Sequence, residues 1–234
     1  MESRLEDVVE FEDNPEPRCP VVLLLDTSGS MAGQPIAELN QALVEFDETM
    51  KADALASLRV EVAIVTFGGR VEVADVAGTG TPLDAKDAFI TADGFQPPTL
   101  MANGDTPMGE AVRKALTLIR ERKDIYKRNG LDYFRPWIFL ITDGEPTDFG
   151  WESAADQVKQ EEARKGVLFY AVGVEGADIQ NLSHFSDQRQ PLKLKGLAFR
   201  ELFQWLSSSL SAVAKSRPGD QVPLPAVGWA SIDT

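Results

Sequence analysis

The chain has 234 residues, 43% of them hydrophobic and 26% charged, which is typical of a globular protein and excludes a largely disordered one. It carries 23 basic and 37 acidic residues, and the formal net charge of −14 disfavours binding to nucleic acids or anionic membranes. A single cysteine, Cys19, excludes a disulfide scaffold, and a single histidine, His184, excludes a histidine-rich metal site. No apolar run is long enough to span a membrane and the acidic N-terminus has no apolar signal segment, so we expect one cytoplasmic protein domain.

The two ends of the chain differ in composition from the stretch between them. Residues 1–18 are rich in acids and lack apolar periodicity, which predicts an acidic tail. Residues 216–234 are rich in proline and predict an extended arm. The folded domain is expected over residues 19–215, where apolar runs alternate with helical patterns.

Two kinds of pattern follow one another within this domain. Short continuous apolar runs are typical of buried strands, and apolar residues at every third or fourth position are typical of helices. Strands are predicted over 21–25, 59–67, 71–73, 137–142, 167–172 and 192–194. Helices are predicted over 36–50, from 107 to the charged run at 120–124, and over 151–165, 179–185 and 199–213. Gly68-Gly69 predicts a hairpin, which makes 71–73 an antiparallel edge strand.

This alternation predicts an α/β, Rossmann-like fold with a mainly parallel central sheet, one antiparallel edge strand, and helices on both faces. Ligands bind such sheets at the carboxyl ends of the strands, near the point where the winding order reverses. A functional site is therefore expected in the segments that follow Leu25, Thr66 and Ile141.

Oxygen-bearing side chains occupy those segments. Asp26, Ser28 and Ser30 follow the first strand at alternate positions, Asp143 follows the strand at 137–142, and Thr106 closes a loop rich in proline and glycine. Hard divalent cations take oxygen ligands, and Mg²⁺ adopts octahedral geometry and usually keeps several waters. Turn and N-cap roles would explain each of these residues alone, so it is their convergence on one edge that favours a metal site.

This arrangement, Asp26-x-Ser28-x-Ser30 followed by Thr106 and then Asp143, resembles the metal-ion-dependent adhesion site (MIDAS) of von Willebrand factor A domains. The resemblance covers residues 19–215. It implies these five residues as ligands of one divalent cation, with Mg²⁺ first and Ca²⁺ or Mn²⁺ as alternatives. It also implies a protein partner whose Asp or Glu is bridged by the metal.

One position departs from that family's pattern. The loop reads Asn-Gly-Asp before Thr106, where the family more often has a run of glycines. Asp105 could add a carboxylate near the metal or point into solvent, and the sequence does not choose. Trp151 is likewise open between the core and an exposed position near the site, while Glu145 and Asp148 are expected at a solvated rim.

The segments Asp26-Thr-Ser-Gly-Ser-Met-Ala-Gly and Thr106-Pro-Met-Gly-Glu-Ala are most similar to the bacterial TerY-type tellurium-resistance proteins. That resemblance implies a non-enzymatic protein–protein interaction module of a tellurite or toxic-anion stress response. The partner would be a protein such as a kinase or phosphatase of the same gene cluster. Residues next to the metal, namely Met31, Asp105 and Glu145, are expected to contact it.

The alternative is a magnesium-dependent phosphotransferase of the haloacid-dehalogenase type. Asp26 would be the nucleophile, and Asp143 and Asp148 would hold the metal. Such enzymes need a second Asp two residues after the nucleophile, where this chain has Ser28, and a hydroxyl is a poor general acid at neutral pH. We therefore expect a binding protein and no enzymatic activity.

Overall fold

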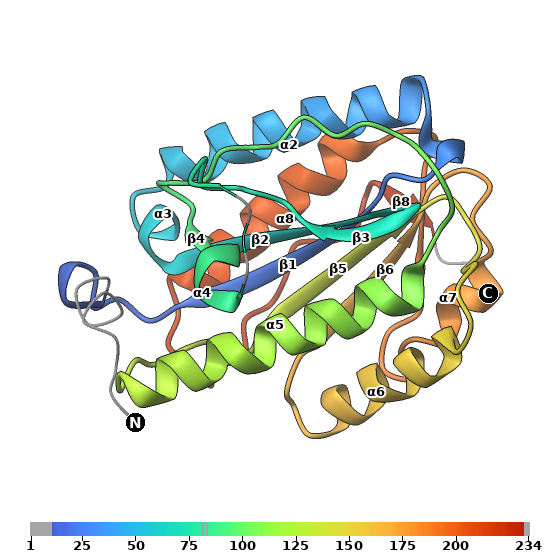
Figure 1. Cartoon of the computed structure of the whole chain (residues 1–234). Coiled ribbons are helices and arrows are strands. Elements are labelled where there is room, and N and C mark those ends of the chain that lie inside the picture. Colours follow the sequence, from blue (N-terminus) through green and yellow to red (C-terminus); the bar gives the residue numbers. More distant parts are fainter. Residues whose placement is uncertain (1–10, 81, 83, 232–234) are drawn as a thin grey trace.

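The fold is a single sheet between two layers of helices (Figure 1). The computed structural model describes residues 11–80, 82 and 84–231, and within them the sheet has eight strands. The strands are β1 (Cys19–Asp26), β2 (Val60–Gly68), β3 (Arg70–Val73), β4 (Ile90–Thr91), β5 (Trp137–Thr142), β6 (Leu168–Gly173), β7 (Leu192–Leu194) and β8 (Ala230–Ser231). Their order is β3-β2-β1-β5-β6-β7-β8, with β4 also paired to β2.

The central strands run parallel, as the sequence predicted. β1 pairs in parallel with β2 and β5, β5 with β6, and β6 with β7. β3 is the predicted antiparallel edge strand, while β4 and β8 also pair in the antiparallel sense. The chain winds outward from β1 to β3 and later from β5 to β7, so the reversal point lies between β1 and β5.

Helices cover both faces of the sheet. They are α2 (Gln34–Ala52), α3 (Ala56–Arg59), α4 (Ala85–Ala88), α5 (Met108–Arg128), α6 (Trp151–Ala163), α7 (Ile179–Ser183) and α8 (Phe199–Ala214), with the 3₁₀ helix η1 (Gly29–Met31). In Figure 1, α2 and α8 lie on one face and α4, α5 and α6 on the other. Strand β1 has apolar side chains on both faces of the sheet, so both faces need a layer of helices. Val21 and Leu23 enter the core under α2 and α8, while Val22 and Leu24 enter the core under α5.

The turn between β2 and β3 differs slightly from the predicted two-glycine hairpin. β2 continues through Gly68, which pairs with Arg70, and Gly69 alone makes the turn with a φ of 69°. A Cβ at Gly68 would lie 2.2 Å from the carbonyl oxygen of Thr27, so only glycine fits there. The strand ends of β1 and β2 are therefore packed backbone against backbone.

A buried ion cluster lies at the amino end of β2. Glu61 is fully buried and accepts from Nε of Arg18 at 2.9 Å, from Nη2 of Arg122 at 2.8 Å, and from the hydroxyl of Tyr126. Burial alone would raise the pKa of Glu61, but Arg122, Tyr126 and Arg18 together lower the pKa below its usual range. The cluster holds residues from the start of the chain, β2 and the end of α5 together.

Both segments outside the predicted domain contact it where they are described. Residues 1–10 of the predicted acidic tail lie outside the described residues, whereas Phe11 is buried beside Tyr126. In the predicted arm, Trp229 is buried against Trp205, and β8 pairs with β7 at the edge of the sheet. No helix in the described part of the chain is long and apolar enough to cross a membrane.

Candidate metal centre

The predicted ligands come from three chain segments that meet at the carboxyl edge of the sheet. Asp26 is the last residue of β1, and Ser28 and Ser30 lie in the turn and the η1 helix that follow. Asp143 follows the last residue of β5, and Thr106 lies two residues before α5 begins. Because β1 and β5 are adjacent and parallel, their carboxyl ends lie side by side at the reversal point.

Backbone hydrogen bonds hold the loop before Thr106 against the turns that follow β1 and β2. The amide of Gly29 donates to the carbonyl of Gly104 at 2.9 Å, and the amide of Asn103 donates to the carbonyl of Thr27 at 2.7 Å. The amide of Gly69 donates to the carbonyl of Asp105 at 2.8 Å. The loop is thus fixed by backbone hydrogen bonds to both the β1 turn and the β2–β3 turn.

Four of the five predicted ligands are connected by short polar contacts. The hydroxyl oxygens of Ser28 and Ser30 lie 3.0 Å apart, and the Ser30 hydroxyl donates to Oδ1 of Asp143 at 2.8 Å. Oδ1 of Asp26 accepts from the backbone amide of Ser28 at 2.7 Å. The structure therefore brings residues 117 positions apart in sequence (143 − 26) to one small cluster of oxygens.

Thr106 faces the same cluster from the loop. A Cβ built on Gly144 would lie 3.3 Å from Oγ1 of Thr106 and 3.9 Å from Oδ2 of Asp26, so both oxygens adjoin this glycine. Within the described residues the Thr106 hydroxyl makes no hydrogen bond to an amide of α5, so it does not cap that helix. Its backbone is held instead by Thr147, whose hydroxyl accepts from the Thr106 amide at 3.0 Å.

The electrostatics of the cluster favour an added cation. Asp26 is 0% exposed, and burial raises the pKa of its carboxyl, with the charge of Asp143 adding to the rise against hydrogen bonds from Thr142 and Ser28. Within the described ranges, neither Asp26 nor Asp143 makes an ion pair with a lysine or arginine. A buried carboxylate beside a second one needs a compensating positive charge, which a divalent cation would supply.

The donor set also fits the kind of cation. Two carboxylates and three hydroxyls are hard oxygen donors, which suit Mg²⁺, Mn²⁺ and Ca²⁺. Among residues 11–80, 82 and 84–231, no group of three or more His, Cys, Asp or Glu side chains is placed to hold a metal. The centre is therefore one of two carboxylates and three neutral oxygens, which is one donor fewer than the six positions of an octahedral ion.

Thr142 is a further member of the site that the sequence analysis did not single out. Its hydroxyl donates to Oδ2 of Asp26 and accepts from the backbone amide of Gly144 at 3.1 Å. It thereby connects the Asp26 carboxylate to the loop that carries Asp143. The sequence feature that could have identified Thr142 is that it carries a hydroxyl at the end of the otherwise apolar run 137–142.

The surface around the cluster differs from the predicted partner face. The expectation that Met31 contacts a partner is wrong, because its side chain is 0% exposed and belongs to the core under α2 and α8. Asp105 and Glu145 are exposed, as a partner contact requires. The sequence analysis missed Met101, which is 82% exposed, and Phe149, which is fully exposed, on the loops that carry Thr106 and Asp143.

Trp151, whose position the sequence left undecided, and Asp148, expected at the solvated rim, both have structural roles. Trp151 is half-buried and stacks on Phe185 with ring centroids 5.8 Å apart, which places it on the core side. Asp148 accepts from the backbone amides of Gly109 at 3.0 Å and Glu110 at 2.9 Å, at the N-terminus of α5. The Asp148 carboxylate therefore caps a helix and is not directed at the metal centre.

Comparison with known proteins identifies the fold family. The family model described as von Willebrand factor type A domain matches residues 21–200. No curated protein sequence matches the chain. The chain is similar to a solved von Willebrand factor type A protein from Catenulispora acidiphila, at 17% identity and a TM-score of 0.60, over 84% of this chain and 43% of that one.

Two other similar structures contain metals. One is proximal thread matrix protein 1 from the mussel byssus with a zinc-occupied MIDAS motif, at 17% identity and a TM-score of 0.54, over 84% of this chain and 48% of that one. The other is the manganese-loaded TRAP protein of Plasmodium vivax, at 19% identity and a TM-score of 0.50, over 80% of this chain and 73% of that one. The chain covers less than half the length of each of the first three structures it matches.

Proposed function

Because the chain belongs to the von Willebrand factor type A domain family, we propose that it is a metal-dependent protein-interaction module without enzymatic activity. The observation that carries the proposal is the oxygen cluster at the reversal point of the sheet. It combines a buried Asp26, the linked hydroxyls of Ser28 and Ser30, and Asp143, with no lysine or arginine paired to either carboxylate in the described residues.

Five residues would hold the cation, namely Asp26, Ser28, Ser30, Thr106 and Asp143. We propose Mg²⁺ as the first choice, with Mn²⁺ or Ca²⁺ as alternatives, because all the donors are oxygens. When bound, the cation would supply an open coordination position for a carboxylate oxygen from outside the chain. The zinc and manganese in similar structures support a divalent cation at this position of the fold.

The partner that this site suits presents an Asp or Glu surrounded by apolar side chains. With a net charge of −14, the rest of the chain repels an acidic partner, so the metal would be the local attraction for its carboxylate. Met101 and Phe149 project from the loops around the site and offer apolar contact area. We propose further that the chain is a TerY-type protein of a tellurite or toxic-anion stress response, with a kinase or phosphatase of the same gene cluster as its partner.

The phosphotransferase alternative has no support in the site. It requires Asp148 near the metal, but both oxygens of that carboxylate accept amides at the start of α5. It also requires a proton donor two residues after Asp26, where Ser28 supplies only a hydroxyl.

The proposal is tested first by calorimetry with MgCl₂. Wild type should bind one Mg²⁺ per chain and Asp26→Ala should bind none, while Asp187→Ala, an exposed carboxylate outside the centre, should bind as wild type does. Equal binding by wild type and Asp26→Ala would overturn the metal assignment.

Partner recognition is tested by a pull-down from the native cell extract. Wild type, Thr106→Ala and Phe149→Ser are each used with MgCl₂ and with EDTA. A partner should be retained by wild type only with Mg²⁺, and both variants should retain less of it. Phe149→Ser should keep wild-type Mg²⁺ affinity, because Phe149 lies outside the oxygen cluster. Equal retention in every lane would show that recognition runs through another surface.

A further inference from the structure

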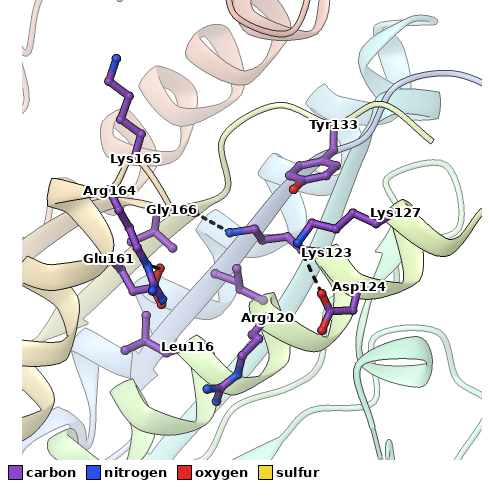
Figure 2. A pocket seen from close by; sticks show the side chains of 12 residues that line it. Leu116, Arg120, Lys123, Asp124, Lys127, Tyr133, Glu161, Arg164, Lys165 and Gly166 are labelled. Carbon is purple, nitrogen blue, oxygen red and sulfur yellow. Dashed lines mark hydrogen bonds and ion pairs between the residues drawn. The ribbon is translucent and has the colours of Figure 1, made fainter. Parts of the chain in front are cut away.

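A second pocket lies at the opposite edge of the sheet from the metal centre. It has a volume of about 440 Å³ and lies between the ends of α5 and α6 and the start of β6 (Figure 2). Its floor is apolar, formed by Leu116, Ile119 and Val167, and its wall includes the half-buried Tyr133. Apart from Gly166, the rest of its lining is charged: Arg120, Lys123, Asp124, Lys127, Glu161, Arg164 and Lys165.

The charge of this pocket is opposite in sign to that of the chain. Five cations and two carboxylates belong to its lining residues, a sum of +3 (5 − 2), or +2 (4 − 2) without Lys165, whose side chain extends away, on a protein of net charge −14. Cations near helix C-termini are ordinary, and this explains Lys127 at the end of α5 and Arg164 and Lys165 after α6. It does not explain Arg120 and Lys123, which lie further back along α5.

Lys123 is one of three cations in the lining that form no ion pair with a carboxylate of the described residues, together with Arg120 and Lys165. Its ammonium reaches the carbonyl of Gly166 at 3.4 Å, and no carboxylate in the described part of the chain forms an ion pair with it. The nearby acids are otherwise engaged, since Glu161 pairs with Arg164 and Asp124 with Lys127. Lys123 is half-buried, and this burial lowers the pKa of its ammonium, with the charge of Glu161 opposing the shift.

Two other lining residues, Lys165 and Tyr133, have constrained positions, the first through its backbone conformation and the second through ring packing. Lys165 has a φ of 59° and is the one non-glycine residue with a positive φ among those described, in a conformation that normally favours glycine. Tyr133 packs on Tyr126 with ring centroids 5.3 Å apart, and Tyr126 in turn donates to the buried Glu61. Figure 2 shows the Tyr133 hydroxyl and the ammonium groups of Lys123 and Lys127 on the same side of the pocket, while Lys165 extends away from it.

We propose that this pocket binds a phosphate monoester. The ammonium groups of Lys123 and Lys127 come from α5, the guanidinium of Arg164 comes from the end of α6, and the Tyr133 hydroxyl comes from the segment before β5. Donors on several sides suit the several oxygens of a dianionic phosphate better than a planar carboxylate. The apolar floor suits an organic group attached to that phosphate. The volume fits a small molecule or one phosphorylated side chain, whereas a nucleic-acid strand would meet the acidic surface beyond the pocket.

The binding test uses phenyl phosphate and isothermal calorimetry in buffer with EDTA, so that no metal at the other edge can hold the phosphate. Wild type should bind, and Lys123→Met should bind at least about tenfold more weakly, as expected for loss of a charge-assisted hydrogen bond. The matched control is Lys114→Met, a lysine earlier on α5 that lines a different pocket, and it should bind as wild type does. Equal affinity of Lys123→Met and wild type would overturn the proposal, and so would equal affinity for benzoate and phenyl phosphate.

A second measurement uses the unmodified chain, so it does not depend on the folding of a variant. Reductive methylation with formaldehyde is followed by peptide mass spectrometry, with and without phenyl phosphate. The ligand should protect Lys123 and leave Lys114 unchanged; equal modification of Lys123 in both samples contradicts the assignment. A phosphoserine peptide is the comparison probe: tighter binding than phenyl phosphate assigns the source to a phosphorylated protein, and weaker binding assigns it to a small molecule.

Discussion

At the scale of single residues, the hydroxyl of Thr142 orients the Asp26 carboxylate together with the amide of Ser28. It donates to Oδ2 of Asp26 and accepts from the amide of Gly144, so it joins the ends of β1 and β5. Groups that orient a metal ligand typically change metal affinity by about 10- to 100-fold when removed.

We therefore expect Thr142→Val to weaken Mg²⁺ binding by about tenfold or more, because the isosteric side chain keeps the packing and loses the orienting hydrogen bond. Calorimetry measures the affinity, and far-UV circular dichroism checks the fold. Thr66→Val is the matched control, a threonine near the end of the neighbouring strand β2 that is not part of the oxygen cluster. Unchanged Mg²⁺ affinity in Thr142→Val would show that Asp26 is positioned by other contacts.

The sequence predicted the oxygen cluster but not its surroundings. Asp26 and Asp143 could be found because each directly follows a long apolar run, and parallel strands bring such positions to one edge. Met31 was misassigned because the direction of a side chain in a short 3₁₀ turn depends on tertiary packing. Phe149 was missed because an aromatic residue in a loop gives no local sign of whether it is exposed or buried.

At the scale of elements, the loop before Thr106 is clamped onto the β2–β3 turn through glycine. Gly104 has a φ of 75°, and a Cβ there would lie 2.5 Å from the Cα of Gly69. Such a distance is too short for any real contact, so the loop or the turn would have to shift. The position of Thr106 therefore depends on the absence of one side chain two residues away.

We expect Gly104→Ala to lower both the free energy of unfolding and the affinity for Mg²⁺. The matched control is Gly130→Ala, where φ is 66° and nothing lies within 4 Å of the added Cβ. Both variants should show about 1 kcal/mol of backbone strain, and only Gly104→Ala should show about 1–3 kcal/mol more from overpacking. Urea unfolding measures the free energy of unfolding of each variant. An equal decrease in the two variants would show that the loop moves aside without cost.

The long elements were all predictable, and among the short ones β3, β7 and α7 were predicted while α3, α4, β4 and β8 were not. The burial pattern of β1 and the apolar stripe of α2 extend over many residues, so hydrophobic periodicity locates them within a few positions. Helices α3 and α4 have four residues each, too few for a period to show. Strand β8 has two residues and exists because it pairs with β7, a contact that the local sequence does not encode.

At the scale of the whole molecule, the metal should couple to folding. The folded chain brings Asp26 and Asp143 together and the unfolded chain separates them, so a cation at this site binds the folded state selectively. A ligand present at a hundredfold its Kd then adds about 2.7 kcal/mol to the free energy of unfolding. For a chain of this length that corresponds to a rise in Tm of about 5–10 °C.

We expect EDTA to lower the Tm of wild type by that amount relative to saturating MgCl₂, as measured by differential scanning calorimetry. Asp143→Asn should shrink the difference, because it removes one carboxylate ligand. A wild-type Tm indifferent to EDTA would count against a site that binds Mg²⁺ in the folded chain.

The buried cluster of Glu61, Arg18 and Arg122 should set the acid sensitivity of the fold. The pKa of Glu61 is lowered in the folded chain, so the unfolded chain takes up its proton first as the pH falls. The stabilisation is therefore fully present above the unfolded pKa of about 4.3 and is lost as the pH falls through the lower folded pKa.

We expect Glu61→Gln to reduce stability at pH 7 by about 3–5 kcal/mol, because it leaves two buried arginines without their counter-charge. The variant should also lose less stability than wild type between pH 7 and pH 3. Glu48→Gln, at an exposed position of α2, is the control and should follow wild type. Urea unfolding at both pH values measures the effect, and an identical pH dependence in all three proteins would refute this role for Glu61.

The pairing of β8 with β7 has a consequence for how the protein behaves in concentrated solution. An uncovered outer strand offers a row of free amides and carbonyls on which a second molecule can build, and this is a common start of fibrous aggregates. Here the amide of Lys195 donates to the carbonyl of Trp229, and Trp229 packs over Trp205, so that row is already occupied. The returning segment thus acts as a built-in cover against polymerisation, and loosening it by Trp229→Ser should raise light scattering with time.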